Sequence, residues 1–239
     1  MATSLVDVRL LVGGYEVTTD HNQCQLDRTK DVVMSTTFGS SSHTYLSGLK
    51  SATYSLQGYF DADGTSAIDD VYHAQWVASG AQVTTIMNPG SATAYSLEGI
   101  HSDYRPFGGT IGDMAAFQID GSGTGDSFHG EVFEAGTSAR STSSNSSGSQ
   151  ITGITTGEKG RAALHVIATT GSPTLDVTIE SDDNGSFTTP TTVLTFTQAT
   201  AQTAEFLSTS AATSDDYWRA AWTFGGTGSI TFVVTFGIA

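Results

Sequence analysis

A serine and a histidine stand close together in the block Gly125-Asp126-Ser127-Phe128 and His129. A serine nucleophile needs a strand-to-helix turn, with a base and an orienting acid placed near it in space. Here the block follows the glycine-rich run Gly121 to Gly125 and precedes another strand-like run. We therefore interpret it as a turn, and we predict no catalytic residue and no enzymatic activity.

Two loops carry carboxylates that could bind calcium. In Asp61-Ala62-Asp63-Gly64 the glycine is fourth, and the twelfth position is Tyr72. An EF-hand loop needs glycine sixth and glutamate twelfth, so we predict a turn before a helix. Asp182-Asp183 precede Asn184-Gly185, which first indicates a hairpin turn, with weak surface metal binding as the alternative.

Other binding chemistries find little support. The six histidines show no pair at helical spacing, and no phosphate-binding lysine follows the glycine-rich run, so we predict no metal and no cofactor. Trp218 and Trp222 alternate on one face with Phe224, a pattern that is more typical of a core than of a sugar platform. The single Cys24 excludes an intrachain disulfide, and we expect it to be partly buried.

The charge is strongly acidic. The net charge is −15, from 24 acids and nine bases, and the residues up to 135 hold 16 acids and five bases. This balance argues against binding of nucleic acid, but it is compatible with DNA passing along an acidic surface that repels its phosphates. No apolar run approaches the ~20 residues of a membrane helix, and the start resembles no signal peptide, so we expect synthesis in a cytoplasm and no membrane.

The composition favours strands joined by tight turns, with one helix. Ser66 to Ser79 is predicted as the helix, with Ser66 and Asp69 as a capping box, Trp76 on the apolar face and Gly80 as the C-terminal stop. Between two of the strands, Gly39 to Lys50 is expected to be a long polar connection. The strands predicted in this part are 5–12, 15–17, 31–38, 51–60, 83–87, 94–100, 114–119 and 128–133.

A Ser/Gly-rich stretch then suggests a domain boundary. Residues 136–149 contain no apolar side chain larger than alanine, so we predict a flexible linker between a domain at 1–135 and a domain at 150–239. The second domain is expected to be a β-sandwich, immunoglobulin-like or jelly-roll-like. Its predicted strands are 163–168, 175–180, 193–197, 203–207, 217–224 and 230–236.

Several short blocks resemble a known family. They are Thr36-Thr37-Phe38-Gly39, Leu46, Gly48-Leu49-Lys50, Tyr54-Ser55-Leu56 and Gly58-Tyr59-Phe60-Asp61, followed by Tyr104 to Gly109 with Gly112-Asp113. In order and spacing, residues 5 to 135 resemble the major tail tube protein of long-tailed, siphovirus-like bacteriophages. The C-terminal domain is a departure from the minimal members of that family.

The resemblance implies a β-sandwich or half-barrel with one helix, in six-membered rings that stack into a tail tube through which DNA passes without specific binding. It implies a place in the virion tail, and partners that are further copies of the chain, the tape measure, terminator and distal tail proteins. The loop between the third and fourth strands is implied to bridge rings. The contact residues expected there are Phe38, Gly39, His43, Tyr45, Leu46, Leu49 and Lys50.

The pattern is compatible with assembly, because a protein built to polymerise can pair its open sheet edges across subunits. A capsid decoration protein, or a tail protein that binds a receptor glycan through the C-terminal domain, is the alternative.

Overall fold

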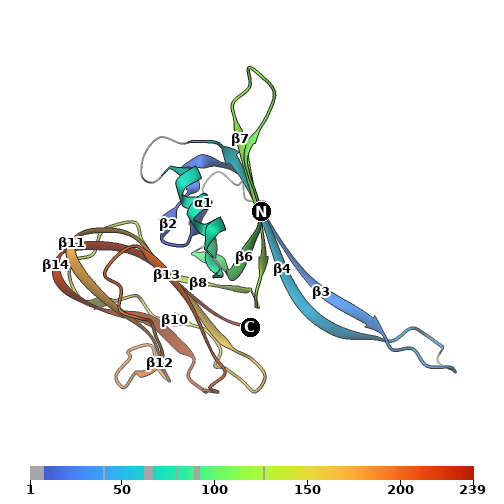
Figure 1. The fold of residues 1–239 in the computed structure, drawn as a ribbon. Helices are drawn as coiled ribbons and strands as arrows, with labels where there is room; N and C mark the ends of the chain where they lie inside the picture. Colours follow the sequence, from blue (N-terminus) through green and yellow to red (C-terminus); the bar gives the residue numbers. More distant parts are fainter. Residues whose placement is uncertain (1–7, 40, 62–66, 79, 89–91, 126) are drawn as a thin grey trace. The chain divides into compact units, whose positions relative to one another are not determined.

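The computed structural model describes residues 8–39, 41–61, 67–78, 80–88, 92–125 and 127–239. As predicted, the protein is mainly β, with one α-helix among these residues, α1 (Ile68–Val77) (Figure 1). The chain forms two compact units. Unit 1 comprises Met1–Thr19, Gln82–Ser96 and Phe128–Ala239, and unit 2 comprises Asp20–Ala81 and Leu97–Ser127.

Unit 1 is built from antiparallel strands around one very long pair. β11 (Gly160–Asp182) and β14 (Tyr217–Ile238) are paired from Gly160 opposite Ile238 to Asp182 opposite Tyr217. β13 (Thr203–Thr209) and β12 (Thr191–Thr195) pair with β11. The remaining strands are β8 (Phe128–Ala135), the first part of β6 (Thr93–Gly108), β5 (Gln82–Asn88), β1 (Arg9–Val12), β2 (Tyr15–Glu16), β9 (Ser144–Asn145) and β10 (Ser149–Gln150).

The long pair replaces four predicted strands. The runs 163–168 and 175–180 are two halves of β11, and 217–224 and 230–236 are two halves of β14. The glycines between the halves, which indicate turns in the sequence, instead lie at a bend of continuous strands. Gly171, Gly226 and Gly228 have positive φ values of 79°, 76° and 107° there, which side chains rarely adopt.

The two halves of the ribbon enclose the largest core. Trp218 from one half stacks on Phe236 from the other, with ring centroids 4.6 Å apart. Leu164 and Val177, from opposite halves of β11, belong to the same buried cluster. The bend therefore lets one pair of strands form both layers of a sandwich-like core.

Residues 136–149 differ from the predicted flexible linker, because their polar side chains serve the neighbouring strand. Ser143 and Ser146 accept hydrogen bonds from the backbone N–H groups of Phe224 and Ala220, both at 2.9 Å. Arg140 pairs with Glu134 at 2.7 Å. The compact units also do not divide at the expected boundary, since β8 pairs with β14 across it.

A buried polar chain connects the strands of unit 1. His165 Nδ1 lies 2.7 Å from the carbonyl oxygen of Gly13, and its Nε2 lies 2.8 Å from Thr85 Oγ1. Thr85 contacts Ser96, which contacts Thr235, at 2.8 and 3.0 Å. A carbonyl can only accept, so Nδ1 carries a proton. Burial lowers the pKa of His165 to about 4, so the ring is neutral at pH 7 and Nε2 accepts from Thr85. The polar chain thus joins β11 to β5, β6, β14 and the turn at Gly13.

Unit 2 is a sheet in which β3 (His21–Met34), β4 (Tyr45–Tyr59), β7 (Ala116–Gly123) and the later part of β6 are neighbours in that order. Helix α1 attaches through Tyr72, which is fully buried. Its hydroxyl lies 2.8 Å from His21 Nε2, and its ring contacts those of His101, Tyr104 and Phe117. A single aromatic residue thus joins the helix to three strands.

The helix differs from its prediction at both ends. It begins at Ile68 after Ala67, which makes no side-chain cap, and the serine of the predicted capping box is not among the described residues. Ser66 and Ser79, the predicted limits, lie outside the described residues. Trp76 is 45% exposed, and Gln75 occupies the buried face with Ile68, Val71 and Tyr72.

We predict that Gly228→Ala destabilises unit 1 by about 3 kcal/mol or more. A Cβ there would lie 1.8 Å from the carbonyl oxygen of Thr170, in addition to the positive φ. Gly157→Ala is the control, because φ is +94° but nothing lies within 4 Å, and only the backbone strain of about 1–2 kcal/mol should remain. Urea unfolding measures both variants, and equal losses would contradict the close contact as the cause.

We also predict that unit 1 loses stability as the pH falls from about 6.5 to 4. Burial lowers the pKa of His165 to about 4, against an ordinary value near 6.5 in the unfolded chain. The unfolded state therefore takes up the proton first, and the stabilisation, full above pH 6.5, decreases by about 3 kcal/mol on the way to pH 4.

The measurement is urea unfolding against pH, followed by the fluorescence of Trp218 and Trp222 in a Trp76→Phe background. His165→Gln should flatten the pH dependence at some cost in stability at pH 7.5, since an amide can still donate and accept. Substitution of the exposed His43 is the control. An unchanged slope in His165→Gln would refute the assignment.

Candidate assembly interface

The hairpin of β3 and β4 extends beyond the rest of the unit 2 sheet (Figure 1). β4 pairs with β7 only from Thr53 to Tyr59, whereas it pairs with β3 along nearly its whole length. Among the described residues, 28–34 and 45–52 therefore form a ribbon of two strands, which we call the distal ribbon. A ribbon of two strands is at best marginally stable in water without a covering partner.

Apolar side chains are exposed on both faces of the distal ribbon. Val33 is directly opposite Leu46, and the next pair along, Met34 and Tyr45, points to the other face. Their exposed fractions lie between 55% and 61%, and Leu49 reaches 81%. Single exposed apolar residues are ordinary, but a contiguous group on a protruding element indicates an interaction surface.

The turn at 35–44 is closed by local hydrogen bonds. The Ser35 N–H donates to the Thr44 carbonyl at 2.8 Å, and the Thr44 N–H donates to Thr36 Oγ1 at 3.0 Å. Phe38 is fully exposed at the tip, next to Gly39 with its φ of +94°. Ser40 lies outside the described residues.

The seven residues predicted as contacts lie along one hairpin, but on different elements from those expected. Tyr45, Leu46, Leu49 and Lys50 belong to β4, and only Phe38, Gly39 and His43 lie in the turn. The His43 and Tyr45 rings are 6.3 Å apart. The predicted connection at 39–50 is thus partly a strand, and β3 begins ten residues earlier than the strand predicted at 31–38.

A second exposed apolar group was missed. Phe107, Ile111 and Met114, which lie at or near the turn between β6 and β7, are 72%, 104% and 66% exposed. Phe107 packs on Phe60 with centroids 4.5 Å apart. The signal was present, since these apolar residues stand singly among glycines and polar residues in a stretch without strand periodicity.

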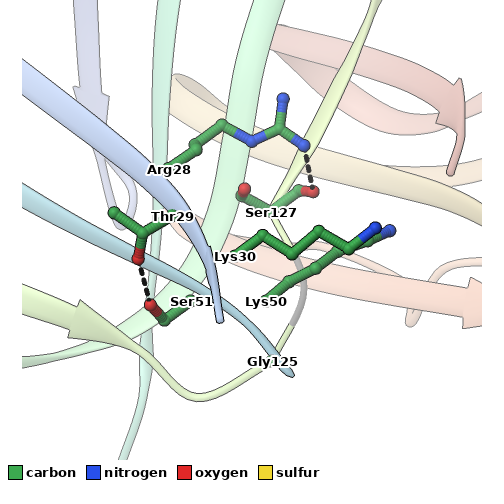
Figure 2. Close-up of a pocket in the computed structure, with 7 residues that line it drawn as sticks. All are labelled: Arg28, Thr29, Lys30, Lys50, Ser51, Gly125 and Ser127. Atoms are coloured by element: carbon green, nitrogen blue, oxygen red, sulfur yellow. Dashed lines mark hydrogen bonds between the residues drawn. The ribbon is translucent and has the colours of Figure 1, made fainter. Parts of the chain in front are cut away.

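Basic residues gather where the distal ribbon joins the sheet. Arg28, Lys30 and Lys50 line a cleft with Thr29, Ser51, Gly125 and Ser127, and Arg28 donates to the Ser127 carbonyl at 3.2 Å (Figure 2). Elsewhere in the first 135 residues, Arg9 pairs with Glu16 and Arg105 with Asp103.

The two carboxylate loops show different outcomes. Asp182 is buried, and its oxygens accept from the backbone N–H groups of Asn184 and Thr189 at 3.2 and 3.0 Å, which lower its pKa against the effect of burial. It therefore organises the loop. Residues 62–64 of the other loop, and Asp126 beside Ser127, lie outside the described residues. In the described part of the chain, no three acids, histidines or cysteines form a metal-binding group.

Two further sequence expectations concern single residues. Cys24 is half-buried, as predicted, and burial raises the pKa of its thiol. His129 is exposed on β8, where its ring lies 4.7 Å from that of Tyr95.

No helix among the described residues is long and apolar enough to cross a membrane.

No protein-family model and no curated protein matches this sequence. Solved structures with a similar fold include a chain from the virion of a native gene transfer agent particle, which is 17% identical, with a TM-score of 0.45, covering 54% of this chain and 98% of the other. A chain from the sheath/tube terminator of an extracellular contractile injection system is 13% identical, with a TM-score of 0.44, covering 54% and 96%.

The SPP1 Dit (gp 19.1) protein, described as part of a phage adsorption apparatus, is 7% identical, with a TM-score of 0.40, covering 97% of this chain and 99% of its own. The likeness in all three cases is weak. The function proposed below is therefore based on the residues of this chain.

We predict that chymotrypsin cleaves the isolated subunit first after Phe38, because this residue is fully exposed in a turn that local hydrogen bonds close. Cleavage in the other apolar turn, after Phe107, should be slower, since Phe107 packs on Phe60. Mass spectrometry of timed digests identifies the order. Preferred cleavage elsewhere would show that the turn is held more firmly than its contacts suggest.

Proposed function

We propose that this chain is a structural protein of a phage tail that self-assembles into stacked, six-membered rings, forming a tube through which DNA passes. The single observation that carries the proposal is the distal ribbon, with its apolar side chains exposed on both faces. The sequence resemblance over residues 5 to 135 adds the tail tube as the kind of assembly. The seven contact residues named above are proposed to touch neighbouring copies.

The ribbon suits a second copy of the chain as its partner. Among the described residues, β3 pairs with no strand other than β4. Residues 45–52 of β4 likewise pair with no strand other than β3, because the pairing of β4 with β7 begins at Thr53. Monomeric proteins normally shorten, charge or cover such edges. Here Val32, Val33 and Met34 lie along an edge that a neighbouring sheet can extend, burying both backbone groups and side chains.

The charge fits a conduit for DNA. The net charge is −15, and repetition around a ring would multiply any acidic surplus that faces the axis. Such a wall would repel phosphate and prevent adhesion. We propose that acidic or neutral polar residues line the channel and that the tape measure, terminator and distal tail proteins meet the tube at its ends.

A tail protein that binds a receptor glycan, or a capsid decoration protein, is the competing function. Such a protein would remain a discrete particle in solution and would bind glycans on an array. Electron microscopy of the purified chain separates the two, because tubes or stacked rings support the proposal and discrete glycan-binding particles contradict it.

We predict that Val33→Thr with Leu46→Thr raises the protein concentration needed for assembly by at least about tenfold. Burying a valine or a leucine contributes roughly 1.5–3 kcal/mol, and each 1.4 kcal/mol is a factor of ten. Threonine keeps the preference for a strand, so the subunit should unfold at an unchanged temperature.

Ile100→Thr is the matched control, because Ile100 is 51% exposed on a strand outside the hairpin. Sedimentation velocity measures assembly, and thermal unfolding of the dilute subunit measures folding. Assembly of the double variant at the wild-type concentration would show that the distal ribbon is not part of the interface.

A further inference from the structure

The cleft at the base of the distal ribbon contains a repulsive contact. Lys30 and Lys50 are direct cross-strand partners in the hairpin, so their side chains share one face. Figure 2 shows both side chains directed the same way, with Arg28 bordering the same cleft. Like charges directly opposite each other destabilise a pair of strands.

This repulsion is not relieved within the described part of the chain, where neither lysine ammonium forms an ion pair. The ion pairs seen among the described residues instead use arginines, such as Arg9, Arg140 and Arg219. A strand pair that keeps two adjacent lysines on a marginal ribbon loses stability unless an anion comes between them.

We propose that this cleft binds a carboxylate-bearing segment of a second copy of this chain, with Lys30 and Lys50 as its recognition residues. The inference rests on the self-assembly proposed above, and it assigns a specific contact to it. Four of the residues that line the cleft, Thr29, Lys30, Lys50 and Ser51, belong to the distal ribbon itself, so a neighbouring copy that binds along the ribbon also reaches the cleft.

Carboxylates of another copy and phosphates of DNA could both pair with the lysines, and the net charge of the chain favours the carboxylates. The chain carries 24 acids against nine bases, so every neighbouring copy offers many carboxylates. A DNA phosphate backbone would meet a small group of cations on a subunit of net charge −15, and the long-range repulsion would oppose its approach. Acidic side chains of another copy are therefore favoured over nucleic acid.

The backbone around the cleft leaves room for such a segment. Nothing lies within 4 Å of the position that a Cβ would take on Gly125. On the opposing strands, the Thr29 and Ser51 hydroxyls are joined at 2.6 Å, which connects the two strands at the level of the lysines. The two ammonium groups are thus presented from a connected pair of strands.

The first experiment uses the full chain with Lys30→Gln and Lys50→Gln together. Loss of both charges should raise the concentration needed for assembly by at least about tenfold and should weaken its dependence on salt. The dilute subunit should unfold at the same or a higher temperature, because the repulsion is removed. A role in folding alone would lower that temperature.

Lys159→Gln is the matched control, with the same chemical change at an exposed lysine of unit 1. If the wild type assembles and the double variant assembles equally well, the cleft proposal fails while the proposed function stands. If the wild type forms no assembly at any concentration tested, both the proposed function and the cleft proposal fail.

The second experiment identifies the occupant in the assembly. A carbodiimide joins an amine to a carboxylate in direct contact, and mixing ¹⁵N-labelled with unlabelled chain marks cross-links between copies. Links from Lys30 or Lys50 to an acid of another copy are expected. Links only to acids of the same copy would overturn the proposal.

Two further probes address other sources of the same anion. Inorganic phosphate should stabilise the wild-type subunit and dissociate the assembly, and both effects should require these lysines. That result would agree with competition for the cleft. Tight binding of a DNA fragment that depends on both lysines would replace the proposed occupant by nucleic acid and overturn the proposal.

Discussion

The continuous pairing of β11 with β14 is the constraint on which unit 1 depends. Because the two strands bend together, the same pair of strands supplies both faces that enclose Trp218 and Phe236. Every other strand of this unit attaches to that pair directly or through β8. A bend of this kind needs backbone conformations that only glycine adopts easily, which explains why Gly171 and Gly228 stand where a strand would otherwise favour β-branched residues.

The sequence predicted the class of fold well, because alternation along strands such as 175–180 and 217–224 is a local property. It could not show that two such runs belong to one strand, since glycines at a bend look the same as glycines at a turn. The serines of 143–146 likewise resemble a flexible linker in composition, whereas their hydroxyls accept from the backbone of β14. Partners far away in the sequence decided both cases.

For the distal ribbon, the sequence did not predict the strands that carry the proposed contact residues. The stretch from His21 to Lys30 is polar, and only His21, Cys24 and Leu26 are partly buried, so its periodicity is weak. The opposed pair Lys30 and Lys50 depends on register, which a sequence does not contain. The geometry of the distal ribbon therefore follows from strand pairing more than from residue type.

Both edges of β14 are largely paired, which protects the protein against association through an exposed strand edge. β11 pairs with β14 along one edge, while β8, β9, β10 and the serines of residues 143–146 cover much of the other. An exposed strand of 22 residues would be a template for fibrils, in which sheets extend without limit. With this edge occupied in every folded copy, another copy cannot add a strand along it, which removes one way in which two copies could join incorrectly.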